Sequence, residues 1–376
     1  MNLNQNRKIL GIGLMAGTSL DGLDIAAVRF QQEGEKWKWN FEVCEHIPYP
    51  EQWYARLKCL PDQDGETFWK THIYFGHFLG KELAVFIKKN ALRPDFVASH
   101  GQTIFHNPAK GYTAQIGDGE TMATYLPCLL VTNFRTRDVA LGGQGAPLVP
   151  VVEPILFPDI PVFLNLGGIA NISFHTSDKP AIGWDIAPCN LITNFLYQQI
   201  TQKNGYDENG NLAKQGNFNP ELYQILQEWP YLKLPPPKST GREIVEKEII
   251  PILLSANIPL QDILNTYHQW LTEIITETII EYAPDTTKTL ITGGGFHNEY
   301  TKSLLISKLS SKNITLSLVG NEIIDFKEAL IFAFLGLKTL FGQPNTEPSV
   351  THSVRNAVSG SIHQPGNNAN AISLLF

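Results

Sequence analysis

Apolar residues gather in two stretches of the chain that share one layout: an apolar strand, a glycine-containing turn and an apolar return strand. The first stretch covers residues 9–28, and its turn contains Asp21-Gly22, a dipeptide typical of hairpins. The second covers residues 162–174, with Gly167-Gly168 at its turn. The repeated layout predicts an internal duplication of a hairpin unit.

Periodicity predicts the other main elements. Helical spacing of apolar residues predicts helices over residues 68–90, 249–256, 263–282 and 326–341. Short apolar runs predict strands over residues 41–47, 95–100 and 289–292. Three bare glycines follow the last strand and would let another group approach the backbone closely, with adenine or ribose as a candidate. The glycine-rich residues 142–146 are a candidate hinge or domain boundary.

The polar tip of the first hairpin admits three interpretations. It is an ordinary turn, or Gly11-x-Gly13-x-x-Ala16 is a dinucleotide-binding fingerprint, or the tip binds the phosphates of ATP. A dinucleotide-binding fold needs a helix directly after the glycines, whereas residues 25–30 predict a strand. Backbone amides, two hydroxyls and two carboxylates at the tip suit phosphate and magnesium. The rest of the chain favours the third interpretation.

Composition excludes several classes of function. The chain has 376 residues, enough for two hydrophobic cores, and its formal net charge of −7 provides no basic surface for nucleic acid. The four cysteines lie far apart and form no zinc-site or disulfide spacing. A polar N-terminus and the lack of a long apolar run predict a soluble cytoplasmic protein without membrane contact.

Several short blocks, in order along nearly the whole chain, resemble the anhydro-N-acetylmuramic acid kinase family. One such block would mean little, whereas the ordered set is specific. The blocks are Gly-Leu-Met-Ala-Gly-Thr-Ser-Leu-Asp-Gly-Leu-Asp (13–24), Ser-His-Gly-Gln-Thr (99–103), Gln-Ile-Gly-Asp-Gly (115–119), Asn-Phe-Arg-Thr-Arg-Asp (133–138), Gly-Gly-Gln-Gly-Ala-Pro-Leu-Val-Pro (142–150), Asn-Leu-Gly-Gly-Ile-Ala-Asn (165–171), Pro-Lys-Ser-Thr-Gly-Arg-Glu (237–243), Thr-Gly-Gly-Gly (292–295) and Pro-Ser-Val-Thr (348–351).

The resemblance implies an α/β fold of two actin-like ATPase domains, ribonuclease H-like in topology, with a nucleotide cleft between them. We expect an N-terminal domain over residues 1–140, completed by 350–376, and a second domain over 141–349. It also implies an ATP- and Mg²⁺-dependent sugar kinase of cell-wall (peptidoglycan) recycling, and a homodimer. The enzyme would open 1,6-anhydro-N-acetylmuramic acid with water and phosphorylate O6, giving N-acetylmuramic acid 6-phosphate and ADP.

Matching the blocks one by one implies roles for single residues. Asp185 would be the catalytic base that activates water, shielded by Trp184 and Ile186 and oriented by Asn190. Asp21 and Asp24 would hold magnesium. The sugar would contact Thr103, Glu328 and one or both of Arg135 and Arg137. ATP would contact Gly17, Thr18, Ser19, Leu20, Asp21, Gly22, Leu23, Asp24, Asn165, Gly167, Gly168, Gly293, Gly294 and Gly295.

Two departures from the family pattern leave alternatives open. Ile186, Ala187 and Cys189 replace the family's threonine and two glycines, and bulkier residues there would reshape the sugar pocket. His352 and Ser353 replace a Gly-Ala pair. The alternatives are a kinase for another sugar or anhydro-sugar, and a non-catalytic nucleotide-binding sensor on the same fold.

Overall fold

The computed structural model describes residues 7–17, 20–175, 181–285, 288–317 and 319–366. Its contacts divide the chain into two compact units, Met1–Pro158 with Phe326–Phe376, and Asp159–Asp325. The predicted domains, 1–140 with 350–376 and 141–349, have other boundaries, and they stay a prediction. The glycine-rich residues 142–146 lie within the first unit.

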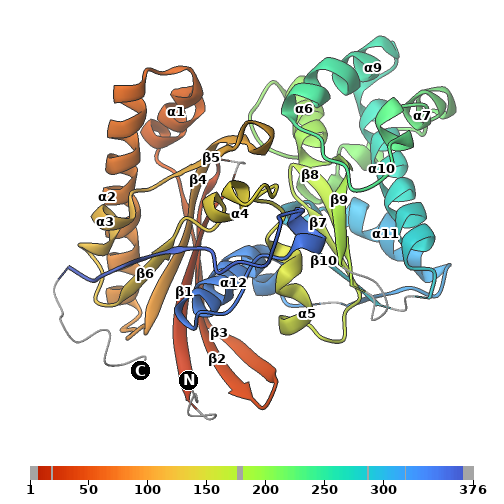
Figure 1. Cartoon of the computed structure of the whole chain (residues 1–376). Helices are drawn as coiled ribbons and strands as arrows, with labels where there is room; N and C mark the ends of the chain where they lie inside the picture. Colours follow the sequence, from red (N-terminus) through yellow and green to blue (C-terminus); the bar gives the residue numbers. More distant parts are fainter. Residues whose placement is uncertain (1–6, 18–19, 176–180, 286–287, 318, 367–376) are drawn as a thin grey trace. The chain divides into compact units, whose positions relative to one another are not determined.

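The first unit is built on a seven-stranded sheet in the order β12-β6-β4-β1-β2-β3, with β5 paired to β4 (Figure 1). β1, β2 and β3 are antiparallel neighbours, whereas β4 runs parallel to β1 and β6 runs parallel to β4. The predicted hairpin and third strand are confirmed. The strands are β1 (Lys8–Ala16), β2 (Gly22–Glu33), β3 (Lys36–Pro48), β4 (Phe96–Asn107), β5 (Tyr112–Ile116), β6 (Leu129–Thr132) and β12 (Ser361–His363).

Helices cover the first sheet. The predicted helix at 68–90 is α2, whose Phe75 and Leu79 are buried in one cluster with Ile12 of β1 and Val97 of β4. Burial of such side chains is the main driving force for this packing. The helices are α1 (Glu51–Cys59), α2 (Gly65–Lys89), α3 (Gly119–Ala123), α4 (Thr136–Ala140), α5 (Glu153–Leu156), α12 (Asn321–Leu340) and α13 (Pro348–Thr351).

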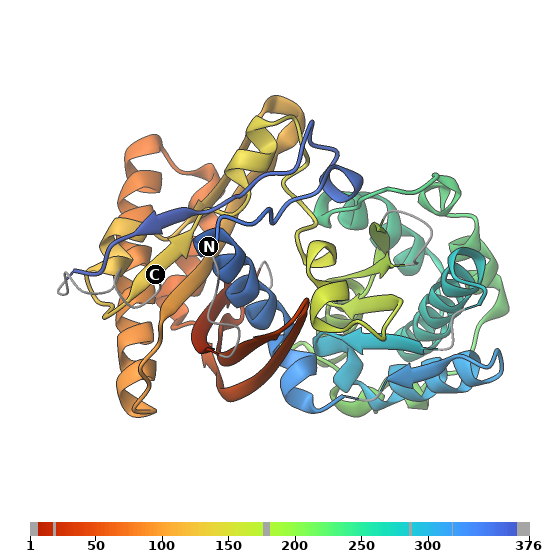
Figure 2. The same ribbon diagram turned by 60° about the horizontal axis from the view of Figure 1, so that its bottom comes forward.

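The two glycines of the supposed dinucleotide fingerprint are explained by packing. A Cβ at Gly13 would lie 1.8 Å from the carbonyl oxygen of Ala329 in α12, and a Cβ at Gly11 would lie 2.4 Å from the Phe96 ring. α12 runs alongside the strands of this sheet (Figure 2). The chain also returns at Gly22 as an antiparallel strand rather than as the helix that a dinucleotide site requires. The dinucleotide interpretation is therefore wrong.

The second unit contains a five-stranded sheet in the order β11-β10-β7-β8-β9. Tyr267 and Trp270 of α10 are fully buried in one cluster with Leu164 and Ile172 of this sheet. The strands are β7 (Val162–Leu166), β8 (Ile169–Phe174), β9 (Ile182–Pro188), β10 (Lys288–Thr292) and β11 (Thr315–Ser317). The helices are α6 (Asn190–Thr201), α7 (Pro220–Gln227), α8 (Arg242–Ile244), α9 (Ile250–Ser255), α10 (Leu260–Tyr282) and α11 (Glu299–Ser310).

Both sheets follow one topological plan. In each, three antiparallel strands that are consecutive in sequence come first, and two parallel strands then add beside the first of them. This order is that of the ribonuclease H-like fold, and its repetition is that of two-domain actin-like ATPases. The duplication predicted from the two hairpins is confirmed by the strand order. Within the described part of the chain, no helix combines the length and apolar character that a membrane span requires.

Candidate functional site

A row of polar side chains crosses four strands of the second sheet. The register pairs Thr292 of β10 with Asn165 of β7, Asn165 with Asn171 of β8, and Asn171 with Asp185 of β9. Directly paired residues place their side chains on the same face of a sheet. Thr292 and Asn165 lie at the carboxyl ends of two parallel strands, which is where α/β sheets bind ligands. The predicted base and a predicted phosphate contact therefore share one face.

Asp185 is half-buried and has few polar partners. Its Oδ2 accepts a hydrogen bond from the Thr240 N–H at 3.1 Å. Burial raises the pKa of Asp185 to about 6, and the bond from Thr240 opposes that rise. A carboxylate with a pKa near neutrality can accept a proton at physiological pH, as a general base must. The surroundings of Asp185 therefore suit the predicted chemistry.

The segment that contains Thr240 is held against β9. The Asp185 N–H donates to the Lys238 carbonyl at 3.1 Å, and the Tyr231 hydroxyl donates to the Asp185 carbonyl at 2.7 Å. Lys238 Nζ donates to the carbonyls of Tyr231 and Leu232, each at 3.0 Å. These bonds explain the position of a motif block to which the sequence assigned no role.

The predicted neighbours of Asp185 act differently from the expectation. Trp184 and Ile186 are buried in the hydrophobic core of the second unit, and Trp184 stacks on Phe174 with ring centroids 5.2 Å apart. Neighbouring side chains of a strand point to opposite faces, so Trp184 does not shield Asp185. Asn190 donates to the Leu166 carbonyl at 3.3 Å. The Asp185 carboxylate is oriented by the Thr240 N–H instead.

A β-bulge follows the catalytic candidate. The pairing of β8 with β9 shifts between Ala170 and Asn171, so that Ile186 is the extra residue on β9. Bulges of this kind redirect side chains and occur beside active sites. The bulge therefore lets Asp185 face the polar row while Ile186 and Ala187 are both buried.

The glycines after β10 contact the end of β7. A Cβ at Gly293, whose φ is +88°, would lie 2.5 Å from Asn165 Oδ1, and a Cβ at Gly295 would lie 2.9 Å from the Leu166 carbonyl oxygen. The group that approaches these two glycines is thus the protein's own chain. Gly294 is different, because the nearest atom to a Cβ there is 4.0 Å away. Of the three, Gly294 has the open surface that a nucleoside contact needs.

The second hairpin turn is tied to the start of α6. The Gly168 carbonyl accepts hydrogen bonds from the N–H groups of Cys189 at 2.8 Å and Leu191 at 3.1 Å, and the Gly167 carbonyl accepts one from Asn190 at 3.0 Å. These bonds orient both peptide planes of the turn. They satisfy amides at the helix N-terminus that have no partner within the helix.

The tip of the first hairpin is fixed from β4. Gln102 Nε2 donates to the Gly17 carbonyl at 3.1 Å, and the Tyr49 hydroxyl donates to Gln102 Oε1 at 3.1 Å. The Leu20 N–H also donates to the Gly17 carbonyl, at 3.3 Å, with Leu20 at a φ of 58°. The predicted contacts Thr18 and Ser19 lie outside the described residues.

Two other residues of the predicted ATP-binding segment, Gly22 and Leu23, contribute to the packing of the first unit. Leu23 is fully buried, and a Cβ at Gly22 would lie 2.3 Å from the Ile47 carbonyl oxygen. The side chain of Leu23 thus belongs to the core of the first unit. Any contact with phosphate at these positions would come from their backbone.

The two predicted magnesium ligands differ in their surroundings. Asp21 is exposed, whereas Asp24 Oδ1 lies 2.7 Å from His46 Nδ1. Among the described residues, no group of three or more His, Cys, Asp or Glu side chains could hold a metal ion. Mg²⁺ in kinases is bound by one or two carboxylates together with phosphates and water. Asp21 and Asp24 therefore stay predicted ligands of a magnesium that arrives with the nucleotide.

Arg135 is the arginine that interacts electrostatically with Glu328. Arg135 Nε donates to His100 Nε2 at 2.9 Å, and Nη1 donates to the Gly145 carbonyl at 2.7 Å. Burial lowers the pKa of Arg135 to about 10, although Glu328 and Asp138 raise it. Burial raises the pKa of Glu328, and the charges of Lys327 and then Arg135 oppose that rise. Arg135 and Glu328, both predicted to contact the sugar, therefore interact with each other through their charges.

Arg137 points elsewhere. It is exposed, and its Nη1 donates to the carbonyl of Val358, near the C-terminus. The sequence does not distinguish the two arginines, whereas in the structure it is Arg135 of the two that interacts electrostatically with Glu328.

Thr103 lies next to a polar hollow of the first unit. Its hydroxyl accepts a hydrogen bond from Gln115 Nε2 at 3.3 Å. Gln115 lines a hollow of about 280 Å³, together with Ser99, whose buried hydroxyl has no hydrogen-bond partner among the described residues. The other lining residues are His72, His100, Gly101, Thr113, Ala114, Gly117, Asp118, Gly119, Thr132, Asn133, Thr136, Ser361 and His363.

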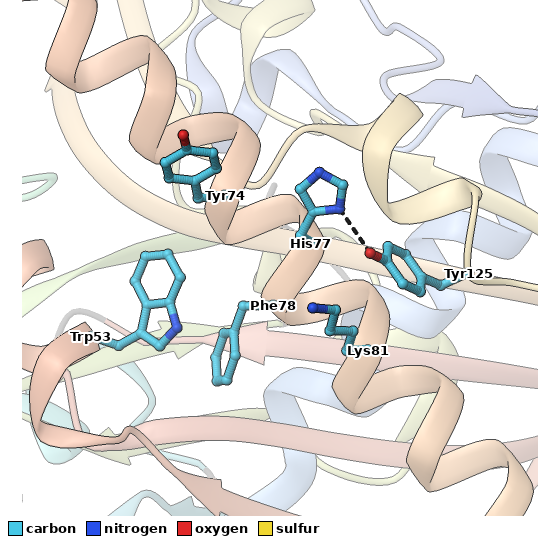
Figure 3. Close-up of a pocket in the computed structure, with 6 residues that line it drawn as sticks. All are labelled: Trp53, Tyr74, His77, Phe78, Lys81 and Tyr125. Carbon is cyan, nitrogen blue, oxygen red and sulfur yellow. Dashed lines mark hydrogen bonds between the residues drawn. The ribbon is translucent and has the colours of Figure 1, made fainter.

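A second hollow, of about 470 Å³, is unrelated to the predicted site. It lies along α2 and contains a hydrogen bond of 2.8 Å between His77 and Tyr125 (Figure 3). None of the predicted site residues lines it. Its lining residues are Trp53, Tyr74, His77, Phe78, Lys81 and Tyr125.

Comparison with known proteins identifies the family. The family model described as anhydro-N-acetylmuramic acid kinase matches residues 9–365. This chain belongs to that family. It is 33% identical over 372 residues to the anhydro-N-acetylmuramic acid kinase of Vibrio vulnificus (strain CMCP6), covering 95% of this chain and 98% of the relative. It is 35% identical over 370 residues to that of Aliivibrio fischeri (strain ATCC 700601 / ES114), covering 94% and 98%.

A solved structure with a similar arrangement is the activator of the 2-hydroxyisocaproyl-CoA dehydratase from Clostridium difficile with bound ADPNP. The TM-score is 0.40 and the identity 12%, with 88% of this chain and 96% of that chain covered. The family assignment rests on the sequence matches and not on this likeness.

Three residues that differ from the family pattern have side chains in the hydrophobic core. Ile186, Ala187 and Cys189 are each buried in the cluster that fills the second unit. Their side chains therefore change core packing rather than line the face that holds Asp185. His352 has a φ of 60°, a left-handed conformation that glycine adopts without strain. This conformation explains why the family places glycine at that position.

Proposed function

We propose that this protein is the kinase that converts 1,6-anhydro-N-acetylmuramic acid and ATP into N-acetylmuramic acid 6-phosphate and ADP, in the recycling of peptidoglycan. The observation that carries the proposal is the partly desolvated Asp185, with a pKa of about 6, on the face of the polar row. Membership of the family supplies the substrate. A cytoplasmic location and a homodimer stay predictions from the resemblance.

The reaction needs one group that accepts a proton from water and one cation that offsets the charge of the phosphoryl group. Asp185 takes a proton from water while the water oxygen bonds to C1 and the C1–O6 bond breaks. O6 then attacks the γ-phosphorus, the bond to the β-phosphate oxygen breaks, and ADP leaves. Magnesium bound with ATP, held by Asp21 and Asp24, would offset charge on the phosphoryl group in transfer.

The remaining site residues bind and position. We assign the β1–β2 turn from Gly17 to Asp24 and the row residue Asn165 to the phosphates, and Gly294 to the nucleoside. Thr103, Arg135 and Glu328 are assigned to the sugar. The hydrogen bonds that hold Gly17, Arg135 and Thr103 support this, because a preorganised site loses less entropy on binding.

Product analysis tests the function. Purified protein with Mg·ATP and anhydro-N-acetylmuramic acid should release ADP and one equivalent of a 6-phosphorylated reducing sugar. Water labelled with ¹⁸O should place its label on C1 and leave the phosphate unlabelled, because water attacks carbon. Phosphorylation of another sugar alone would identify a different kinase, and ATP binding without turnover on a panel of amino sugars would identify a sensor.

The Asp185→Asn variant tests the base. The amide can still accept the Thr240 N–H, so the fold should persist, while turnover should fall by about two to four powers of ten. Wild-type turnover should decline below about pH 6, where Asp185 becomes protonated. Because its pKa is raised on folding, the carboxylate lowers stability as pH rises toward 6, so the variant's melting temperature at pH 7 should equal or exceed the wild-type value.

Asp207→Asn is the matched structural control. The buried Asp207 carboxylate accepts the N–H groups of Leu212 at 2.8 Å and Ala213 at 2.9 Å. Its amide variant should lose stability and keep normal turnover per folded molecule. More than about a tenth of wild-type activity in Asp185→Asn would exclude the role of base.

Paired lysine variants test the choice between the arginines. Lysine cannot reproduce both hydrogen bonds of a guanidinium fork, so Arg135→Lys should lower kcat/KM for the sugar by about 10- to 100-fold. Arg137→Lys should stay within about twofold of wild type, because Arg137 is exposed and bonds to a backbone carbonyl. Steady-state kinetics with sugar varied at saturating ATP measures both. Equal losses in the two variants would reject the distinction.

A further inference from the structure

His100 is buried against α12, and its two ring nitrogens face hydrogen-bonding groups of different kinds. Its Nδ1 lies 2.8 Å from the Gly101 carbonyl, and its Nε2 lies 2.9 Å from Arg135 Nε. A carbonyl only accepts and an arginine Nε only donates. His100 must therefore carry its proton on Nδ1, donate it to Gly101 and accept from Arg135 through Nε2.

The environment keeps His100 in this neutral tautomer. Only 4% of the residue is exposed, and its ring packs on Phe332 of α12 with centroids 4.6 Å apart. Burial, and then the charge of Arg135, hold the pKa of His100 well below its usual range. A protonated ring would have no lone pair for Arg135 and would repel it. His100 is thus a permanent acceptor at the working pH.

Two fixed acceptors hold two of the three nitrogens of the Arg135 guanidinium. His100 takes the Nε–H, and the Gly145 carbonyl takes an Nη1–H. The Gly145 backbone is itself anchored, since its N–H donates to Asp138 Oδ2 at 2.7 Å. The Nη2 group has no hydrogen-bond partner among the described residues, and the two nitrogens that are held set the direction in which it points.

We propose that His100 is a positioning residue that holds the Arg135 guanidinium so that Nη2 is presented to oxygen atoms of the sugar. The inference rests on the proposed function for the identity of the ligand, but the holding of Arg135 does not depend on it. The effect expected is on sugar binding and orientation rather than on ATP. A planar guanidinium held at two of its nitrogens presents the third with little further loss of entropy.

The two amide variants of His100 separate its two hydrogen bonds. The amide of His100→Asn can reach the position of Nδ1 and keep the bond to Gly101, but it leaves Arg135 Nε without its acceptor. The longer amide of His100→Gln can reach the position of Nε2 and accept from Arg135, while the bond to Gly101 is lost. Each variant loses one bond, so their melting temperatures should be similar.

Kinetics and NMR provide independent readouts. His100→Asn should raise the KM for the sugar by about 10- to 100-fold with the KM for ATP unchanged, and His100→Gln should stay within about threefold of wild type. In ¹⁵N spectra, the Arg135 Nε–H signal, assigned by its loss in Arg135→Lys, should exchange slowly with water in wild type and His100→Gln. It should exchange fast in His100→Asn.

A buried histidine of the second unit supplies the control. His268 is 2% exposed and its Nδ1 lies 2.8 Å from Thr301 Oγ1. Its Asn and Gln variants should change stability only, with both KM values kept.

Two outcomes would overturn the inference: equal sugar KM values in the two His100 variants, or a slowly exchanging Arg135 signal in His100→Asn. A wild-type protein without activity on the anhydro-sugar would instead contradict the proposed function, and the NMR comparison would still decide whether His100 holds Arg135.

Discussion

The proposed chemistry depends on the partial removal of water from the Asp185 carboxylate. Among the described residues, the Asp185 carboxylate receives one hydrogen bond, from the Thr240 N–H, and this bond offsets only part of the cost of burying its charge. The resulting pKa of about 6 makes the group ionised near neutral pH yet basic enough to accept a proton from water. A fully solvated aspartate would be ionised as well, but it would be a weaker base.

The fold arranges this environment by repeating one sheet plan and changing it locally. In the second unit, cross-strand pairing aligns Thr292, Asn165, Asn171 and Asp185 on one face. The bulge at Ile186 and the segment that ends at Thr240 then enclose the carboxylate. The first unit uses the same plan for a different purpose, since its fourth strand supplies both Gln102, which holds the hairpin tip, and His100, which holds Arg135.

Sequence alone could predict the hairpins, their duplication and the main helices, because hydrophobic periodicity and turn residues are local signals. It could not predict contacts that depend on register or on distant segments. Thr240 lies 55 positions from Asp185 in sequence, and the separation of Arg135 from Arg137 depends on the direction of a short helix. Trp184 was expected to shield Asp185, but strand alternation buries it in the core instead. The sequence shows that His100 belongs to the block at residues 99–103. Nothing in the local sequence, however, indicates its tautomer or its hydrogen-bond partner.

The most direct test of this account is the pKa of Asp185 itself. A ¹³C titration of the aspartate carboxyl carbons, with the Asp185 signal assigned by its loss in Asp185→Asn, measures that value in the folded protein without substrate. The account predicts a midpoint at about pH 6. A midpoint at about pH 4, the ordinary value for an exposed aspartate, would show a hydrated carboxylate and would contradict the central claim.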